Sequence, residues 1–267
     1  MKTDIRHNLP DVAAWLVDTD KQTRFATSVA INRTANAVKD GLQQETRKVF
    51  DRPTTYIINS NRVRKYSNRQ DLEAVIGPTY MGGKGVDPQI ILAPQIEGGS
   101  RKLKASERAL QRAGILPPGY FTVPGSAAPM DGYGNIKSGF VIQLLSYFQA
   151  FGEQGYKANT TAKRKAAMAK KGKGPAGYSR INGVEYFVAY GKLRGGRSAH
   201  LAPGIYSRTG THGSDIKPVL MFVRRPLYKK RFDLQAVGQR IVSEVFATEF
   251  QKAWTQAMAT ARPSRVA

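Results

Sequence analysis

The chain has 267 residues and carries 42 Lys and Arg against 19 Asp and Glu, which gives a formal charge of +23 and an isoelectric point near 10.3. Its 41% hydrophobic residues are enough for a core, and its length predicts one large or two small domains. The absence of cysteine excludes disulfides and thiolate chemistry, and no apolar run reaches the ~18 residues of a membrane span, so we expect no membrane partner.

The first predicted element is a long N-terminal helix from about Asp20 to Phe50, preceded by an N-terminal arm over residues 1–19. Asp18 and Thr19 offer side-chain oxygens that cap a helix, and Pro53 disfavours helix in the residue before it. Apolar side chains recur on one face at helical spacing, at Ile31, Ala35, Val38, Leu42 and Val49. Because this stripe is narrow, we expect the helix to lie on a sheet or on a neighbouring subunit.

Three short strands are predicted next. The segment Thr54–Ile58 is rich in β-branched and aromatic residues, and Arg62–Tyr66 alternates between polar and apolar residues. A further strand, Leu72–Ile76, precedes Gly77 and Pro78, which break it.

A helical and loop insertion is predicted from about residue 80 to residue 175. Its first helix is capped near Ser100 and is closed by Gly114, a residue type that favours the left-handed conformation after a helix. A second helix begins at Ser138 and ends at Gly152, and it is apolar around much of its circumference. We therefore expect this second helix to be buried.

The end of the insertion is a basic loop over residues 157–175. No acidic residue occurs between Glu153 and Glu185, and Met168 is the one large apolar side chain in the centre of the loop. Such a segment cannot bury enough surface to offset its ordering entropy. We expect a mobile cationic loop whose partner is polyanionic.

After the loop the hydrophobic period changes to two, as in β-strands. Asn182–Gly183 between two alternating runs indicates a β-hairpin with a type I′ turn. Four antiparallel strands are predicted: Tyr178–Ile181, Val184–Tyr190, Gly204–Arg208 and Val219–Val223. A long C-terminal helix follows from about 234 to 261. The prediction is one α+β domain over 20–267, with a long helix at each end and an antiparallel sheet of about four or more strands.

No residue pattern indicates catalysis, a cofactor or a metal. His7, His200 and His212 lack the spacing of a helical metal site. The glycine clusters lack the order of a phosphate-binding loop or a dinucleotide fingerprint. Four acids could converge in space, but nothing in the sequence shows it: Glu97, Glu107, Asp131 and Glu185. We expect a protein that is not an enzyme.

The basic residues predict phosphate contacts that are independent of base sequence. The DNA-facing candidates are Lys163, Arg164, Lys165, Lys170, Lys171, Lys173, Arg180, Arg194 and Arg197. A second basic patch, Arg224–Arg231, precedes the last helix. Tyr178, Tyr186 and Tyr190 are strand residues, for which core packing is the better interpretation than base stacking.

Both ends of the chain resemble a family of tailed-phage proteins, the minor tail protein Z or tail completion proteins. The resemblance rests on Phe25–Asp51, with Ala-Ile-Asn-Arg-Thr-Ala at 30–35, and on Lys217–Val223 followed by Phe232 and a terminal amphipathic helix. The segments Pro94–Arg101 and Asp131–Asn135 are similar to those of larger prophage proteins of the same kind.

The resemblance implies a structural virion protein without catalysis or cofactor, in a ring around the DNA path at the head-proximal end of the tail. Its implied partners are further copies of itself, other neck, connector or tail proteins, and phage DNA. It would be made in the host cytoplasm and located at the head–tail junction or in the tail. One alternative is a sequence-independent nucleic-acid-binding protein outside any virion. Another is an enzyme, such as a nuclease or a lytic protein.

Both long helices offer surfaces for contacts between subunits. The subunit-interface candidates are Ile31, Val38, Leu42, Ile241, Val245, Phe250 and Trp254. Trp254 has two interpretations, because a large aromatic near a chain end anchors interfaces but also closes cores.

Overall fold

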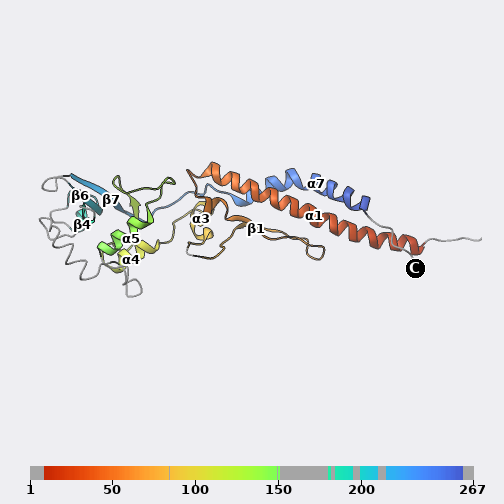
Figure 1. Cartoon of the computed structure of the whole chain (residues 1–267), viewed down its shortest axis with the longest axis horizontal. Coiled ribbons are helices and arrows are strands. Elements are labelled where there is room, and N and C mark those ends of the chain that lie inside the picture. The colour runs from red at the N-terminus through yellow and green to blue at the C-terminus, as the bar shows by residue number, and fades with distance from the viewer. Residues whose placement is uncertain are drawn as a thin grey trace, which may run out of the picture. The chain divides into compact units, whose positions relative to one another are not determined.

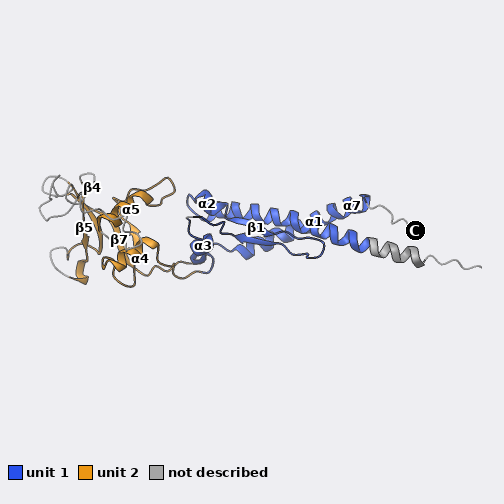
Figure 2. Ribbon diagram, turned by 60° about the horizontal axis from the view of Figure 1, so that its bottom comes forward, with its two compact units in different colours: residues 1–97, 230–267 blue, residues 98–229 orange. Residues whose placement is uncertain are grey.

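The computed structural model describes residues 9–83, 85–148, 150, 180–181, 184–194, 199–209 and 215–260. The chain forms two compact units (Figure 2). Unit 1 comprises residues 1–97 and 230–267, and unit 2 comprises residues 98–229. The sequence had suggested one domain with an insertion from about 80 to 175. In the structure the inserted part is longer, and it contains the whole larger sheet.

The α+β class is confirmed, with a long helix near each end of the chain (Figure 1). Helix α1 spans Leu9–Val49 and helix α7 spans Leu234–Thr260. The predicted start of α1 near Asp20 is wrong by more than two turns, so part of the predicted arm is helical. No glycine or proline follows Pro10 until Gly41, and the missing N–H of a proline is tolerated in a first helical turn.

Helix α1 lies mainly along α7 (Figure 1). At one end of the pair, Ala26 is in a buried cluster with Ala253 and Ala257. At the other end, Val38 and Leu42 are in a cluster with Ile241. This order makes the helices antiparallel, and the alanines allow the two backbones to approach closely. The apolar stripe predicted for α1 is therefore covered largely by α7.

The remainder of unit 1 is a small layer beside α1. It contains α2 (Thr55–Ile58), the antiparallel pair of β1 (Asn61–Lys65) and β2 (Val75–Pro78), and α3 (Pro88–Ile96). The predicted strand at Thr54–Ile58 is wrong. Thr54 caps a short helix instead, since its Oγ1 accepts a hydrogen bond from the N–H of Ile57 at 3.4 Å.

In each unit, hydrogen bonds hold together the two chain segments that lead to the other unit. In unit 1, the N–H groups of Arg231 and Phe232 both donate to the carbonyl of Gln95, at 2.9 and 3.0 Å. In unit 2, Gly99 and Tyr228 form an antiparallel bridge with hydrogen bonds of 2.9 and 2.7 Å. These bonds join the ends of each unit, so a long insertion leaves the helical unit intact.

Unit 2 is a five-stranded antiparallel sheet with the order β3-β7-β6-β5-β4. The strands are β3 (Tyr120–Pro124), β4 (Arg180–Ile181), β5 (Val184–Ala189), β6 (Gly204–Thr209) and β7 (Asp215–Arg224). The four predicted strands and the β4–β5 pairing are confirmed, although Asn182–Gly183 lies outside the described residues. Strand β3 was missed because it is bounded by prolines, which an edge strand tolerates.

Two helices cover this sheet, α4 (Ala105–Arg112) and α5 (Ser138–Tyr147). Leu110 of α4 and Leu144 and Leu145 of α5 share one buried cluster with Tyr186, Ile205 and Phe222 of the strands. The burial predicted for α5 is confirmed at these two leucines. Gly114 follows α4 with φ of 69°, as its predicted role after the helix requires.

The contact between Gly41 and Ile241 gives a prediction about stability. A Cβ at Gly41 would overlap the Cδ1 methyl of Ile241 across the α1–α7 interface. Ile241→Val should lower the free energy of unfolding by about 0.5–1.5 kcal/mol. In the double variant, the methyl of Gly41→Ala fills the space that the shorter Val leaves. We expect the double variant to be about 0.5–1 kcal/mol more stable than the sum of the single effects, measured by urea unfolding. Strict additivity would contradict this packing.

Candidate nucleic-acid interface

The positive charge of the chain is concentrated in unit 2. Residues 98–229 contain 22 Lys and Arg against 5 Asp and Glu, a formal charge of +17. Unit 1 contains 20 Lys and Arg against 14 Asp and Glu, a formal charge of +6. Even if every acid of unit 2 paired with a different cation, 17 cations of that unit would have no acidic partner within it.

Unit 1 uses its acids to neutralise its own cations. Its described ion pairs include Arg24–Asp20, Arg33–Glu249, Lys39–Asp40, Arg52–Asp51, Lys65–Asp71, Lys230–Asp233, Arg240–Glu244 and Lys252–Glu249. Pairs at the surface add little stability, but they lower the local potential. The strong positive field therefore belongs to unit 2.

Helix α4 displays a row of cations on its outer face. Arg108 and Arg112 lie one turn apart on α4, and Lys104, the N-cap residue, precedes the helix at the same spacing; all three are exposed. The opposite face carries Ala109 and Leu110, which are buried in the core of unit 2. The amphipathic pattern of α4 thus fixes the direction of the basic row.

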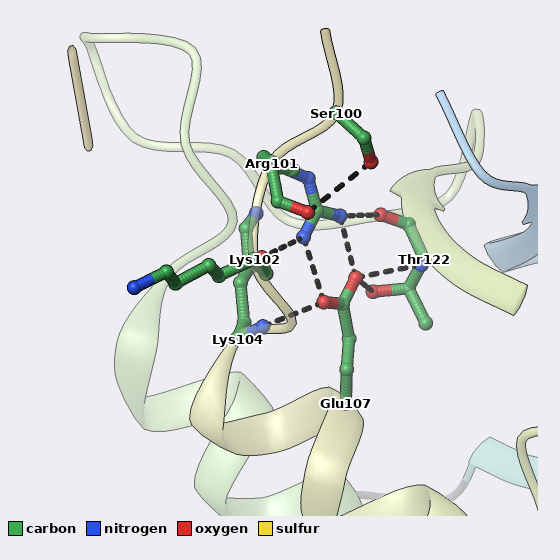
Figure 3. Close-up of polar contacts among 6 residues, drawn as sticks. All are labelled: Ser100, Arg101, Lys102, Lys104, Glu107 and Thr122. Atoms are coloured by element: carbon green, nitrogen blue, oxygen red, sulfur yellow. Dashed lines mark hydrogen bonds and ion pairs between the residues drawn. The ribbon is translucent and has the colours of Figure 1, made fainter. Parts of the chain in front are cut away.

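A buried ion pair fixes the start of α4 (Figure 3). Glu107 has no exposed surface, and its carboxylate accepts two hydrogen bonds from the Arg101 guanidinium, at 2.5 and 2.7 Å. The N–H of Lys104 donates to the same carboxylate at 2.7 Å, as in the return half of a capping box. The N–H and hydroxyl of Thr122 on β3 donate at 2.7 and 3.0 Å.

The Arg101 guanidinium has further partners. It donates to the carbonyls of Lys102 and Thr122, both at 3.2 Å, and lies over the ring of Phe121 at 4.9 Å from its centroid. Both charged groups are therefore fully used within the fold. Glu107 and Arg101 form a structural anchor between α4 and β3, and the carboxylate is not free for catalysis.

The electrostatics of this anchor follow from its geometry. Burial opposes the charge on Glu107, but the hydrogen bonds from Arg101 and from the N–H groups of Thr122 and Lys104 outweigh it, so the pKa of Glu107 is lowered. Desolvation, and then repulsion by Arg101, lowers the pKa of the Lys104 ammonium.

The basic row continues beyond the end of α4. The hydroxyl of Tyr190 donates to the carbonyl of Gly114 at 3.1 Å, which holds the 3₁₀ turn η2 (Gly191–Leu193) next to the helix end. The Arg194 guanidinium lies 3.8 Å from the centroid of the Tyr190 ring. Lys192 and Arg194 are both exposed. Together with the α4 cations they form a group that we name the α4 basic row: Lys104, Arg108, Arg112, Lys192 and Arg194.

The predicted DNA-facing residues are only partly described. Arg194 is in the α4 basic row, and Arg180 is on β4. The others lie outside the described residues: Lys163, Arg164, Lys165, Lys170, Lys171, Lys173 and Arg197. The sequence analysis missed the cations of α4, although their spacing of four residues was a readable signal. Tyr186 is buried and Tyr190 supports Arg194, while Tyr178 lies outside the described residues.

The second predicted patch is divided between the units. Arg224, Arg225 and Lys229 of unit 2 are exposed. Lys230 of unit 1 pairs with Asp233 at 2.6 Å. Arg231 donates to the side chain of Gln95 at 2.6 Å and lies over Phe50. The last two cations therefore help to hold unit 1 together, and the patch is smaller than its sequence suggests.

Most of the subunit-interface candidates contact their own chain. Val38, Leu42 and Ile241 are buried between α1 and α7, with Val245 beside them. Phe250 and Trp254 are stacked and pack on Ala26, Ala253 and Ala257, and both remain partly exposed. Ile31 is also partly exposed. A role between subunits stays a prediction for these residues, and it concerns the partly exposed ones most.

Neither a metal site nor a membrane-spanning helix is found among the described residues. Within the described ranges, no three His, Asp or Glu side chains are grouped so that they could hold a metal ion. No described helix is long and apolar enough to cross a membrane. The chain matches no protein-family model, and no curated protein or solved structure matches it either.

The buried anchor gives a prediction about unit 2. Glu107→Gln leaves the Arg101 guanidinium without a counter-charge, so the free energy of unfolding should fall by about 3 kcal/mol, measured by urea unfolding at pH 7. Because the folded pKa of Glu107 is lowered, its stabilisation is present above the ordinary value of 4.5 and is lost as the pH falls through the folded pKa. The difference between wild type and variant should therefore shrink below pH 4.5.

Asp215→Asn is the matched control. Asp215 is another carboxylate of unit 2, and its ion pair with Lys217, at 3.0 Å, is exposed. Its replacement should have a far smaller effect than Glu107→Gln. Equal effects of the two substitutions would contradict the anchor.

Proposed function

We propose that this protein is a structural, non-enzymatic nucleic-acid-binding component, in which unit 2 contacts phosphates and unit 1 serves assembly. The observation that carries the proposal is the separation of charge: +17 in unit 2 against +6 in unit 1. Uncompensated cations on that scale repel one another, and a polyanion relieves the repulsion. A carboxylate-rich protein could do the same, but a nucleic acid is the polyanion that a row of Lys and Arg suits most directly.

The contacts that we propose are independent of base sequence. The α4 basic row consists of Lys and Arg, which bind phosphates as point charges or as bidentate donors. Arg194 is additionally supported by the ring of Tyr190. The basic loop, with its run of cations between 157 and 175, adds to the charge of unit 2. Such a surface follows a backbone without reading bases, which suits a protein that must let DNA pass.

The place that we propose for the protein is the neck of a tailed bacteriophage, as a tail completion component in an oligomeric ring around the DNA path. The support is the resemblance at both ends of the chain together with the charge of unit 2. The helical unit 1 provides long surfaces for packing against neighbours. The second candidate is a nucleic-acid-binding protein outside the virion, which the same charge distribution would also serve.

The first test concerns salt. Binding to duplex DNA of random sequence should weaken steeply with salt, because each phosphate contact contributes about 0.9 to the slope of log affinity against log salt. Replacing Arg108, Arg112, Lys192 and Arg194 by Gln should flatten this slope. The same is expected when the loop residues are replaced together by Gln: Lys163, Arg164, Lys165, Lys170, Lys171 and Lys173.

The control removes as much charge from unit 1. Replacing Arg47, Lys48, Arg62 and Arg69 by Gln lowers the charge of the chain by the same four units as the α4 variant. This control should retain a slope close to that of the wild type. A slope that depends only on net charge, wherever the charge is removed, would defeat the assignment to unit 2.

The second test separates the two candidate places. A neck component should be found in purified phage particles from its source at a small, fixed copy number, and a label on it should lie at the head–tail junction in electron micrographs. Its loss should leave separate heads and tails. DNA binding without any association with particles would favour the second candidate.

A further inference from the structure

An apolar groove runs along α1 in unit 1. Its floor is α1, one wall is α7, and the other wall is the segment 73–77 that includes the start of β2. Two adjoining cavities of about 270 and 500 Å³ form the groove, and both are lined by Val38, Ala74, Ile76 and Val242. Val242 is 44% exposed, so the apolar surface is open from outside. This volume suits the large side chains on one face of a peptide or helix.

A polar group in the floor of the groove lacks a partner. Thr34 is only 4% exposed, it lines the smaller cavity, and its Oγ1 has no hydrogen-bond partner. Thr23, Thr27 and Thr46 of the same helix each donate to the carbonyl four residues earlier, at 2.7 Å. A buried hydroxyl without a partner is costly, so the groove is incomplete as it stands.

The described part of α7 is shorter than α1 and ends at Thr260. Ala257 packs near Ala26, and α7 ends only three residues later, at Thr260. With a rise of about 1.5 Å per residue in antiparallel helices, Thr260 lies opposite about Thr23. The sequence of the stretch 9–18 is rich in apolar residues and has Val12, Trp15 and Leu16 at helical i, i+3, i+4 spacing.

We propose that the N-terminal turns of α1, Leu9–Asp18, of one copy dock into the groove between α1, α7 and segment 73–77 of a second copy. The inference rests on the proposed role in a ring, and it names the contact that builds the ring. The contact is head-to-tail, because the two surfaces are different parts of the chain. Such a contact repeats from copy to copy and closes into a ring when the rotation allows it.

Length and charge support this occupant. The groove follows α1 from Ile31 to Leu42, about 16 Å, and ten helical residues are about 15 Å long. The stretch 9–18 contains two acids, Asp11 and Asp18, and no cation, although the chain as a whole is strongly basic. The Arg64 guanidinium lies beside Gly77 at the groove, where Glu73 is already paired with Lys65. An acidic, apolar helix therefore fits this groove by charge as well as by shape.

The cysteine-free chain allows a direct test. Full-length Ala13→Cys and Val242→Cys variants, one of them isotopically labelled, are mixed and mildly oxidised. Within one chain these positions are about 35 Å apart along α1, because Val242 lies beside Val38, so a disulfide between them must join two copies. We expect a disulfide-linked dimer of one labelled and one unlabelled chain, identified by mass spectrometry.

Two matched pairs control for random collision. At helical spacing, Ala14 lies opposite the stripe of Val12, Trp15 and Leu16. Gln251 is exposed and lies two and a half turns from Val242, on the opposite face of α7. The pairs Ala14→Cys with Val242→Cys and Ala13→Cys with Gln251→Cys should give much less of the mixed disulfide. Equal yields in all three mixtures would overturn the proposal. That outcome is expected if the groove binds a different protein and not a second copy of this chain.

Self-association gives a second measurement. Trp15→Ala should weaken self-association at least tenfold in sedimentation experiments without lowering the melting temperature, since the proposed contact joins two copies and is not part of the fold of one chain. Thr34→Val removes the unpartnered hydroxyl, so it should weaken association without destabilising the monomer. Unchanged association in both variants would overturn the proposal. All these measurements are made without DNA, so their failure leaves the salt dependence of unit 2 standing, and the reverse also holds.

Discussion

Uncompensated positive charge in residues 98–229 is the constraint on which the rest of the structure depends. This unit has 22 cations and 5 acids, so it must stay folded although its surface charges repel one another. The apolar cluster under α4 and α5 supplies the cohesion, and the Arg101–Glu107 anchor ties α4 to β3. The anchor uses one of the few acids of the unit inside the fold, where it neutralises one cation and leaves the surface cations exposed.

Unit 1 is stabilised in a different way. Its cations are largely matched by acids, and its two long helices approach through alanine and glycine at Ala26, Gly41 and Ala253. A close, antiparallel pair of this kind buries one stripe of each helix and leaves the other faces for contacts elsewhere. The open groove over Thr34 is a place where the described part of this unit leaves apolar surface exposed and a buried hydroxyl without a partner.

The division of labour between the units follows from the order of the chain. The bonds between Gln95 and Arg231 and between Gly99 and Tyr228 close each unit on itself. Unit 2 can therefore be inserted into the chain of unit 1 while each unit keeps its own core. Such an arrangement lets one unit contact a polyanion while the other contacts neighbouring chains.

Much of this could be predicted from local pattern. The α+β class, the last helix, α5, the Gly114 terminus and the order of the later strands were readable, because hydrophobic period and turn residues act over a few positions. The predictions for the start of α1 and for Thr54–Ile58 were wrong. At Thr54–Ile58 the reason is that β-branched residues form a helical turn when Thr54 caps it. Strand β3 was hidden by its flanking prolines.

The sequence by itself determined the chain's charge, the absence of thiol chemistry and the helical or extended preference of most segments. Only the tertiary structure decided that α1 pairs with α7, that the sheet belongs to the inserted unit, and that Glu107 is a buried anchor and not a free acid. The reason is physical. Periodicity states which face of an element is apolar, but which distant element covers that face depends on contacts between residues more than 200 positions apart, as between Ala26 and Ala253.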